Sequence, residues 1–319
     1  MEKTSKRRDL LKGTLAAAAA GALALSLEEQ ALAAADPSVS TESAAEPAAD
    51  LLPTGKIGKV NVTRLICGGN LISGFAHSRD LIYVSAMLKH YFTDEKVWET
   101  LHICEQAGIN TALLRNDDQV IRILDEYWKK RGGKIQWLAQ VYPKEGDTET
   151  DIKRAVDNGA VACYIQGGIG DRWVKADRVD LLEKSLKVIR DAGVPGGVGG
   201  HVLDVPMAVE AAGLEPDFYM KTFHRPDYWS YTKEGKHDNS WCATPEETAK
   251  FMQEVKRPWI AFKTLAAGAI HPRAGFRYVF ENGADFACVG MFDFQVREDA
   301  AIARKVLSGK LKRQRPWQA

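Results

Sequence analysis

The sequence has almost no excess charge and few cysteines, and these absences argue against several classes of function. Among 319 residues, 43 Lys and Arg stand against 42 Asp and Glu, for a formal net charge of +1. Nucleic-acid-binding proteins usually present a strong basic field, so this balance predicts no nucleic-acid partner. The five cysteines form no CxxC pair, so a zinc ribbon or a dithiol redox motif has no support.

Most of the cysteines lie inside apolar runs, which is typical of small buried hydrophobic residues. Those in apolar runs are Cys67, Cys104, Cys163 and Cys288. Cys242 lies in a polar segment, and we expect it in a loop. The histidines show no HxH or HExxH spacing, so no local motif predicts a metal centre.

The sequence has an apolar run near its start, but the run is too short for a typical membrane span. It covers residues 13–27, whereas a spanning helix needs roughly 20 apolar residues. The pair Arg7-Arg8 precedes it, which resembles a twin-arginine export signal. Small residues in A-x-A spacing offer cleavage sites at Ala31, Ala33 and Ala35.

We therefore predict a signal peptide over residues 1–35 and a periplasmic or other extracytoplasmic location. The partner in that step is the twin-arginine export machinery, and no stable membrane span remains after cleavage. An uncleaved anchor is the alternative. Because proteins exported by this route fold first, often around a cofactor, the signal also favours a bound cofactor.

The segments that flank the central region have the composition of irregular chain. Residues 36–54 are rich in Ala, Ser, Pro and Glu over most of their length, which predicts a disordered linker. Residues 310–319 form a short basic tail, which we expect to be a solvated end rather than a binding patch. Its basic residues are Lys310, Lys312, Arg313 and Arg315.

Between residues 55 and 309, one pattern repeats eight times. Each repeat has a short apolar run, a polar loop, and a segment with apolar residues three and four apart that ends near Gly or Pro. The predicted strands are Leu65–Asn70, Thr111–Leu114, Ile135–Val141, Ala162–Gln166, Gly196–His201, Phe218–Phe223, Trp259–Leu265 and Phe286–Met291. The predicted helices cover about 93–107, 119–130, 149–158, 179–192, 205–212, 274–282 and 296–307, with a further one from Thr244 that opens with a capping box to Glu247.

Eight strand-then-helix units predict parallel strands joined by helical crossovers, and eight strands close a barrel. The fold class is therefore α/β, a (β/α)8 TIM barrel in a single domain. A doubly wound open sheet is the alternative. Such a sheet usually carries a glycine-rich phosphate turn after its first strand, and Gly68-Gly69-Asn70 does not match GxGxxG.

Polar residues follow the predicted strands, where TIM barrels place their active sites. We predict a catalytic role for Arg115, Gln166, His201, Lys221, His224 and Lys263. We predict substrate contacts for Asn70, Gln140, Tyr142 and Asp293. The alternative for any one of them is that it only satisfies backbone groups or a neighbouring side chain.

Two connections are longer than usual, at residues 71–92 and 224–243, and long loops in compact domains are often lids or binding loops. The second loop contains Trp229 and Trp241, to which we assign substrate contacts. Aromatic rings beside polar groups suit a sugar or another ring-shaped ligand through stacking. The alternative is a small core that fixes the loop.

Residues 56–307 resemble the aldo/keto reductase superfamily. The resemblance rests on Leu65–Asn70, on Trp98–Asn110, and on Leu265–Ile270 followed by Phe276–Met291. It implies NADP as a cofactor, with its phosphates near the seventh and eighth strands. On this resemblance Lys263, Gly268, Arg273 and Gly290 are the candidate cofactor-binding residues.

The chain departs from the family at the catalytic tetrad. Asn110 stands at the position of the family's Asp, and Arg115 stands at the position of its Tyr. Gln140 and Gln166 replace the Lys and the His. The lost tyrosine is the acid that protonates the carbonyl oxygen, and arginine holds its proton too tightly to take over.

Other chemistries fit the same residues. Lys221 and Lys263 end neighbouring strands, which resembles the paired lysines of Schiff-base aldolases of the deoxyribose-phosphate type. His201, His224 and Asp293 are an alternative metal-binding set. The leading hypothesis is an oxidoreductase acting on a small carbonyl or carbohydrate-type substrate, and a lyase and a non-catalytic ligand-binding barrel are the alternatives.

Overall fold

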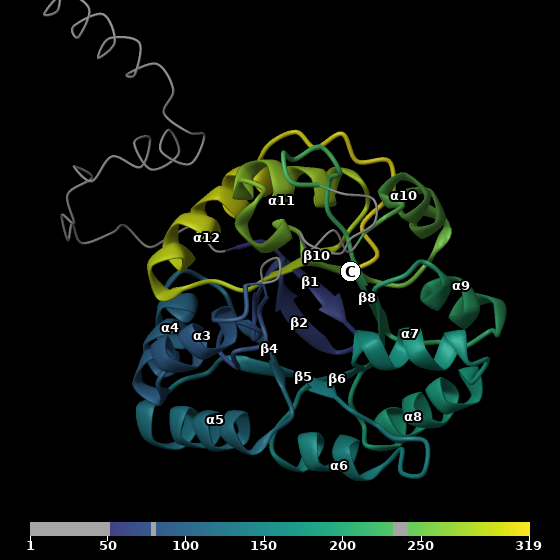
Figure 1. Ribbon diagram of the computed structural model, residues 1–319, viewed down its shortest axis with the longest axis horizontal. Coiled ribbons are helices and arrows are strands. Elements are labelled where there is room, and N and C mark those ends of the chain that lie inside the picture. The colour runs from purple at the N-terminus through teal and green to yellow at the C-terminus, as the bar shows by residue number, and fades with distance from the viewer. Residues whose placement is uncertain (1–51, 78–80, 232–241) are drawn as a thin grey trace, which may run out of the picture. The chain divides into compact units, whose positions relative to one another are not determined.

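Eight parallel strands close into a barrel in the order in which they occur in the chain. The computed structural model describes residues 52–77, 81–231 and 242–319 (Figure 1). The last strand pairs with the first, so the predicted (β/α)8 barrel is confirmed. The strands are β3 (Leu65–Gly68), β4 (Thr111–Arg115), β5 (Gln136–Val141), β6 (Ala162–Ile165), β7 (Gly196–Gly200), β8 (Phe218–Thr222), β9 (Trp259–Phe262) and β10 (Phe286–Val289).

Helices follow the strands and form a ring around them (Figure 1). They are α4 (Asp94–Gln106), α5 (Asp118–Arg131), α6 (Thr150–Asp157), α8 (Val179–Asp191), α9 (Asp204–Ala211), α10 (Pro245–Glu254), α11 (Pro272–Glu281) and α12 (Asp293–Ser308). The predicted N-cap of α4 is confirmed, because Thr93 Oγ1 accepts a hydrogen bond from Lys96 N at 3.3 Å. The predicted capping box of α10 is wrong, because the Thr244 side chain makes no capping bond.

Several elements were not predicted from the sequence. A hairpin of β1 (Thr54–Ile57) and β2 (Val60–Thr63) precedes the barrel, and α3 (Val84–Tyr91) lies in the first long connection. The helix α7 (Gly167–Lys175) and a short 3-10 turn, η1 (Ala266–Gly268), follow the fourth and seventh strands of the barrel. None of the described helices is long and apolar enough to cross a membrane.

The barrel separates two apolar cores. The inner core includes Phe218 and Met220 of β8, and the hairpin adds Ile57, Val60 and Val62 to it. The outer core, between the sheet and the helices, includes Tyr219 of the same strand and Phe223, which follows it. Because side chains alternate along a strand, this division fixes which residues point into the barrel and which point towards the helices.

Glycines in β7 and α7 make room for close packing. A side chain at Gly197 would overlap the ring of Phe218, and one at Gly199 would lie 3.0 Å from the ring of Tyr164. A side chain at Gly170 would overlap the carbonyl oxygen of Gly199, so α7 lies directly on the backbone of β7. The glycine-rich stretch that follows β6 therefore forms a helix because it packs on β7, against its low intrinsic helix propensity.

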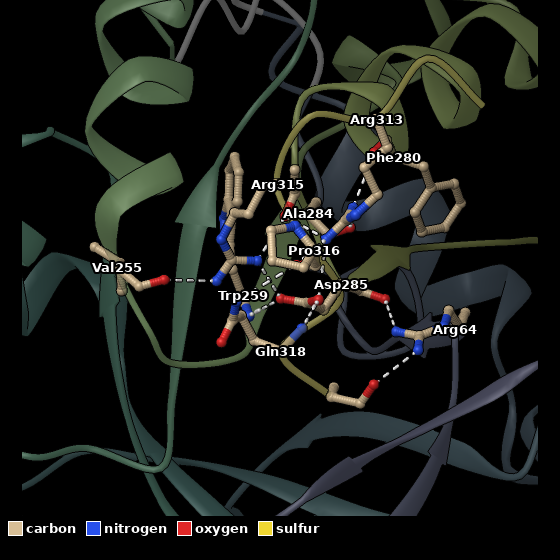
Figure 2. Close-up of polar contacts among 12 residues, drawn as sticks. Arg64, Val255, Trp259, Phe280, Ala284, Asp285, Arg313, Arg315, Pro316 and Gln318 are labelled. Atoms are coloured by element: carbon tan, nitrogen blue, oxygen red, sulfur yellow. Dashed lines mark hydrogen bonds and ion pairs between the residues drawn. The ribbon is translucent and has the colours of Figure 1, made fainter.

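The C-terminal tail is folded, and the prediction of a solvated end is wrong for Arg313 and Arg315. Arg315 and Asp285 are both fully buried and form an ion pair of 2.6 Å (Figure 2). Asp285 also accepts hydrogen bonds from Arg313 at 3.1 Å, from Trp259 N at 3.1 Å and from Gln318 N at 2.9 Å. Four donors thus satisfy one buried carboxylate, which is what makes its burial tolerable.

A second arginine links the tail to the start of the barrel. Arg64, which precedes β3, donates to the carbonyl oxygens of Asp285 at 2.8 Å and Ala319 at 2.9 Å (Figure 2). The ring of Trp317 lies between the guanidinium groups of Arg64 and Arg313, each 3.8 Å from its centroid. The tail therefore belongs to the folded barrel unit.

The cysteines are all free and buried. This includes Cys242, which the sequence placed in a polar loop. Its side chain is 1% exposed, because it precedes α10 and packs in the outer core. Leu52, at the end of the predicted linker, is buried in the same core.

Replacing Arg315 by Met tests the buried carboxylate. We expect the free energy of unfolding to fall by about 3–5 kcal/mol, because Asp285 loses one of its two arginine partners while it stays buried. The measurement is urea unfolding followed by circular dichroism. Lys312→Met is the control, since Lys312 is exposed in the same tail, and equal midpoints for the two variants would contradict the assignment.

Replacing Gly170 by Ala tests the contact between α7 and β7. Ala favours a helix by roughly 0.5–1 kcal/mol over Gly, so propensity alone predicts stabilisation. We instead expect destabilisation by about 1–3 kcal/mol, because the added methyl group overlaps the strand backbone. Gly146→Ala is the control, since nothing lies within 4 Å of a side chain there. A stabilised Gly170 variant would mean that α7 does not lie against β7.

Candidate active site

The carboxyl ends of the strands bring several polar residues to one end of the barrel, which we call the mouth. Leu113 and Leu138 belong to the inner core, so Arg115 and Gln140, two residues further along, point inward at the mouth. The structure brings Arg115, Gln140 and Tyr142 together. It engages the side chains of His224 and Asp293 with other partners.

Arg115 lies between two aromatic rings. Its guanidinium carbon is 3.9 Å from the ring centroid of Phe75 and 4.9 Å from that of Tyr142. Its Nε donates to Asp117 at 3.1 Å. The Phe75 ring is half-exposed and comes from the first long connection, which the sequence indicated as a binding loop without identifying this residue.

Gln140 connects two tyrosines through its side-chain amide. Tyr164, which lies in the inner core, donates its hydroxyl proton to Gln140 Oε1 at 2.5 Å. The Gln140 amide nitrogen donates to the hydroxyl oxygen of Tyr142. The backbone N–H of Tyr142 donates to Asp151 at 2.6 Å, which fixes the start of this loop. The sequence does not identify Tyr164 as a site residue, because an aromatic residue within a strand is usually part of the core.

His201 forms a dyad with Asp171. Asp171 accepts from His201 Nδ1 at 2.6 Å and from the backbone N–H of His201 at 2.8 Å. The carboxylate therefore holds the ring with Nδ1 protonated. Asp171 was missed because it lies on α7, where the sequence shows a glycine-rich stretch that resembles a loop.

Lys221 points away from the mouth, between Tyr219 and Phe223 on the outward side of β8. It is 2% exposed, and its ammonium group donates to His201 O at 2.7 Å, Thr222 O at 2.9 Å and Thr222 Oγ1 at 2.9 Å. Burial lowers the pKa of Lys221, yet three acceptors around one nitrogen require the protonated form. A protonated amine has no lone pair, so this placement argues against Lys221 as a nucleophile.

Lys263 follows β9 in a strained conformation. Its φ of 57° is in the left-handed region, as are the φ values of Ala266 and Ala267. Such residues cost about 1–3 kcal/mol each and cluster at functional sites. The side chain lies 3.1 Å from His77 Nε2, and burial lowers the pKa of Lys263 to about 7. An amine with this pKa exchanges protons readily near neutral pH.

The candidate cofactor-binding residues lie beyond Lys263. Gly268 has a φ of 91° and open space where a side chain would be. Arg273 is exposed in the first turn of α11, where its N–H bonds to the capping His271 side chain. Gly290 differs, because a side chain there would lie 3.1 Å from Leu71, so its small size accommodates Leu71.

Three predicted site residues have structural partners. Gln166 caps α7, accepting from Ile169 N at 3.1 Å. Asp293 accepts hydrogen bonds from Tyr91 at 2.5 Å and Lys96 at 3.1 Å. Burial would raise the pKa of Asp293, but these bonds outweigh it and lower the pKa. The side chain of Asn70 is exposed, and its carbonyl oxygen accepts from two backbone N–H groups of the following turn.

His224 is fully buried. Its Nδ1 donates to Arg225 O at 3.0 Å and its Nε2 accepts from Cys242 N at 3.2 Å, so the ring is neutral, and burial lowers its pKa. Its ring contacts those of Tyr228 and Tyr231, which supports a small loop core. Trp229 is exposed, and Trp241 lies outside the described residues.

The alternative metal set is not assembled. His201, His224 and Asp293 each bond to different partners, and the described part of the chain contains no group of three potential ligands from His, Cys, Asp and Glu. The metal hypothesis from the sequence is therefore wrong for these three residues.

Comparison with models of known protein families gives no match, and comparison with curated protein sequences gives none either. Similarity appears among solved structures. A protein assigned to the aldo-keto reductases from Pseudomonas aeruginosa has a TM-score of 0.57 at 16% identity, covering 83% of this chain and 98% of its own. The protein Gox0644, solved in complex with NADPH, has a TM-score of 0.52 at 11% identity, covering 82% of this chain and 90% of its own. This chain therefore has the closed barrel fold that these proteins share.

Proposed function

We propose that this protein is an exported oxidoreductase that reduces a small carbonyl or carbohydrate-type substrate with NADPH. The strained segment from Lys263 to Gly268 carries the proposal, because it lies where the sequence resembles the cofactor loop of aldo/keto reductases. A barrel of the same fold binds NADPH, which supports the same choice of cofactor. Export rests on the Arg7-Arg8 signal, which lies outside the described residues.

The residues around this segment fit the phosphate end of the cofactor. The space beside Gly268 is open, and Lys263 and Arg273 supply cations on either side of it along the chain. Lys263 and Arg273 would hold phosphate oxygens, as cations do in other nucleotide sites. The first turn of α12 offers no second phosphate site, because the Asp293 carboxylate already lies there.

The mouth supplies the remaining requirements of a carbonyl reductase. When bound, NADPH supplies the hydride. The Arg115 guanidinium group would stabilise the negative charge that develops on the carbonyl oxygen during reduction. Asp171 orients the His201 ring, and histidine is the side chain that most often transfers protons in enzymes. Water is kept from the inside of the barrel by the inner core beneath these groups.

The pH dependence of NADPH binding tests the role of Lys263. Below pH 7 its ammonium form attracts phosphate, and above pH 7 the neutral amine does not. We therefore expect affinity to fall about tenfold between about pH 6 and about pH 8.5 through loss of this charge. Fluorescence titration of purified protein with NADPH measures the effect.

Two variants isolate this charge from the titration of NADPH itself. Lys263→Arg keeps the cation at every pH used, so the fall should be absent. Lys263→Met should bind weakly at both pH values. A wild-type protein that binds NADPH with the same pH profile as Lys263→Arg would show that Lys263 does not contact the phosphates. Saturable binding without turnover of any carbonyl probe would favour a non-catalytic barrel.

A Schiff-base lyase is the second candidate, and the lowered pKa of Lys263 favours it. The structure reverses the roles expected from the sequence, because Lys221 is held as an ammonium and Lys263 is the amine that loses its proton near neutral pH. The Lys263 amine would attack a carbonyl carbon to give a carbinolamine, whose hydroxyl group would take up a proton and leave as water, giving an iminium ion. Only burial lowers its pKa here, without a contribution from a neighbouring cation.

Reductive trapping tests this candidate. Protein is incubated with glyceraldehyde and sodium cyanoborohydride, and the adduct is located by peptide mass spectrometry. The lyase predicts labelling at Lys263, rising as pH increases through about 7, when the neutral amine forms. Lys221→Met should label normally, whereas Lys263→Arg should not. Labelling confined to exposed surface lysines would exclude the Schiff-base chemistry.

A further inference from the structure

The hydrogen bonds at the mouth leave one phenol with a proton to give. Gln140 Oε1 only accepts, so Tyr164 must be the donor in their bond, and Gln140 Nε2 only donates, so the Tyr142 oxygen must be the acceptor. The proton on Tyr142 is therefore not used within this chain of bonds. Among the described residues, no acceptor receives it.

Arg115 also has N–H donors that no acceptor among the described residues receives. Its Nε is bonded to Asp117, but its two Nη groups make no hydrogen bond within the described parts of the chain. The rings of Phe75 and Tyr142 both contact the guanidinium group and hold it in place. Arg115 and Tyr142 thus lie next to each other at the mouth, with donors to which the oxygen atom of a ligand can bond.

This pair occurs where the sequence departs from the aldo/keto reductase pattern. Arg115 stands at the position of the lost acid, and its guanidinium lies over the ring of a different tyrosine, supplied by the next strand of the barrel. The proton donor and the cation are thus both present at the mouth, on different strands from those of the family.

We propose that Tyr142 is the acid that protonates the carbonyl oxygen during reduction, and that Arg115 stabilises the charge on that oxygen. The inference rests on the proposed reductase function. Tyr142 is a catalytic residue in this scheme, and Gln140 is a positioning residue that holds its oxygen.

The step balances in atoms and electrons. The carbonyl carbon receives a hydride from NADPH, which leaves as NADP⁺, and the carbonyl oxygen takes the proton of Tyr142, giving an alcohol. The phenolate that remains accepts the N–H of Gln140 and lies beside the Arg115 cation, until water returns a proton.

The electrostatics agree with this role. Burial raises the pKa of Tyr142 above its usual value, while Arg115 and the Gln140 hydrogen bond oppose the rise. The phenol is therefore protonated at neutral pH, as an acid must be. Removing Arg115 should raise the pKa further, because it removes a charge that favours the phenolate.

The test compares Tyr142→Phe with Tyr127→Phe, using NADPH and 4-nitrobenzaldehyde as the probe substrate. We expect kcat of Tyr142→Phe to fall at least a hundredfold, the range of general acid catalysis, with KM and the NADPH dissociation constant changed less than threefold. Tyr127 also donates a hydrogen bond from a buried ring, but on α5, so its variant controls for loss of a buried hydroxyl. It should keep wild-type kcat.

A pH profile distinguishes catalysis from a structural effect. The wild-type kcat should fall at alkaline pH as Tyr142 ionises. In Arg115→Met this fall should move to higher pH, with a lower plateau. In Gln140→Leu it should also move upward, because the phenolate loses a hydrogen bond.

The outcomes separate the two proposals. If NADPH binds and the probe is reduced, but Tyr142→Phe keeps more than a tenth of kcat, the reductase stands and the role of Tyr142 is overturned. An alkaline limb that does not move in Arg115→Met also overturns it. If the wild type neither binds NADPH nor reduces the probe, the reductase function fails and the role of Tyr142 fails with it.

Discussion

The interior of an eight-stranded barrel is only wide enough for its own side chains to fill, and the rest of this structure depends on that limit. Aromatic rings such as Phe218 and Tyr164 fit inside because β7 has glycines opposite them. The rings and the hairpin fill the inner core with largely apolar side chains. The charged groups of Asp285 and Arg115 lie at the two ends of the barrel instead.

Charged groups at the two ends of the barrel differ in how their hydrogen bonds are satisfied. Near the amino ends of the strands, the Asp285 carboxylate is surrounded by donors, and the tail completes the set (Figure 2). All of that carboxylate's capacity is used inside the protein, so this end contributes to stability. At the mouth, donors on Arg115 and Tyr142 exceed the acceptors available in the described residues. The Arg115 side chain is partly exposed, so water bonds to its donors until a ligand that brings oxygen atoms replaces the water.

The strands and most helices could be predicted because periodicity and capping are local properties. The start of α4 at Thr93 followed from one such signal. The helix α7 could not be predicted, since its glycines disfavour a helix until β7 is present to pack against. Asp171 was missed for that reason alone. The burial of Arg315 was missed because its partner Asp285 lies 30 residues earlier in the chain.

The sequence predicts where the candidate site lies better than it predicts what each residue does there. Strand ends gave the correct neighbourhood for Arg115, Gln140 and Tyr142, because parallel strands all present the same end. The role of a residue depends on the direction in which its side chain points and on the hydrogen bonds that its atoms already make. Lys221 lies at a strand end, but the alternation of β8 turns it towards the helices.

In the proposed reductase, proton donation depends on charge as well as on the presence of a hydroxyl group. Tyr164 and Tyr142 both have phenol groups near Gln140, yet only Tyr142 lies under the Arg115 cation and keeps its own proton unused. Full burial raises the pKa of Tyr164 and outweighs the lowering of that pKa by Arg115, so Tyr164 resists ionisation. Placing Arg115 over the Tyr142 ring favours the phenolate that forms when the proton leaves. In the proposed reductase, the arginine at the position of the aldo/keto reductase acid therefore has a physical use beside a different tyrosine.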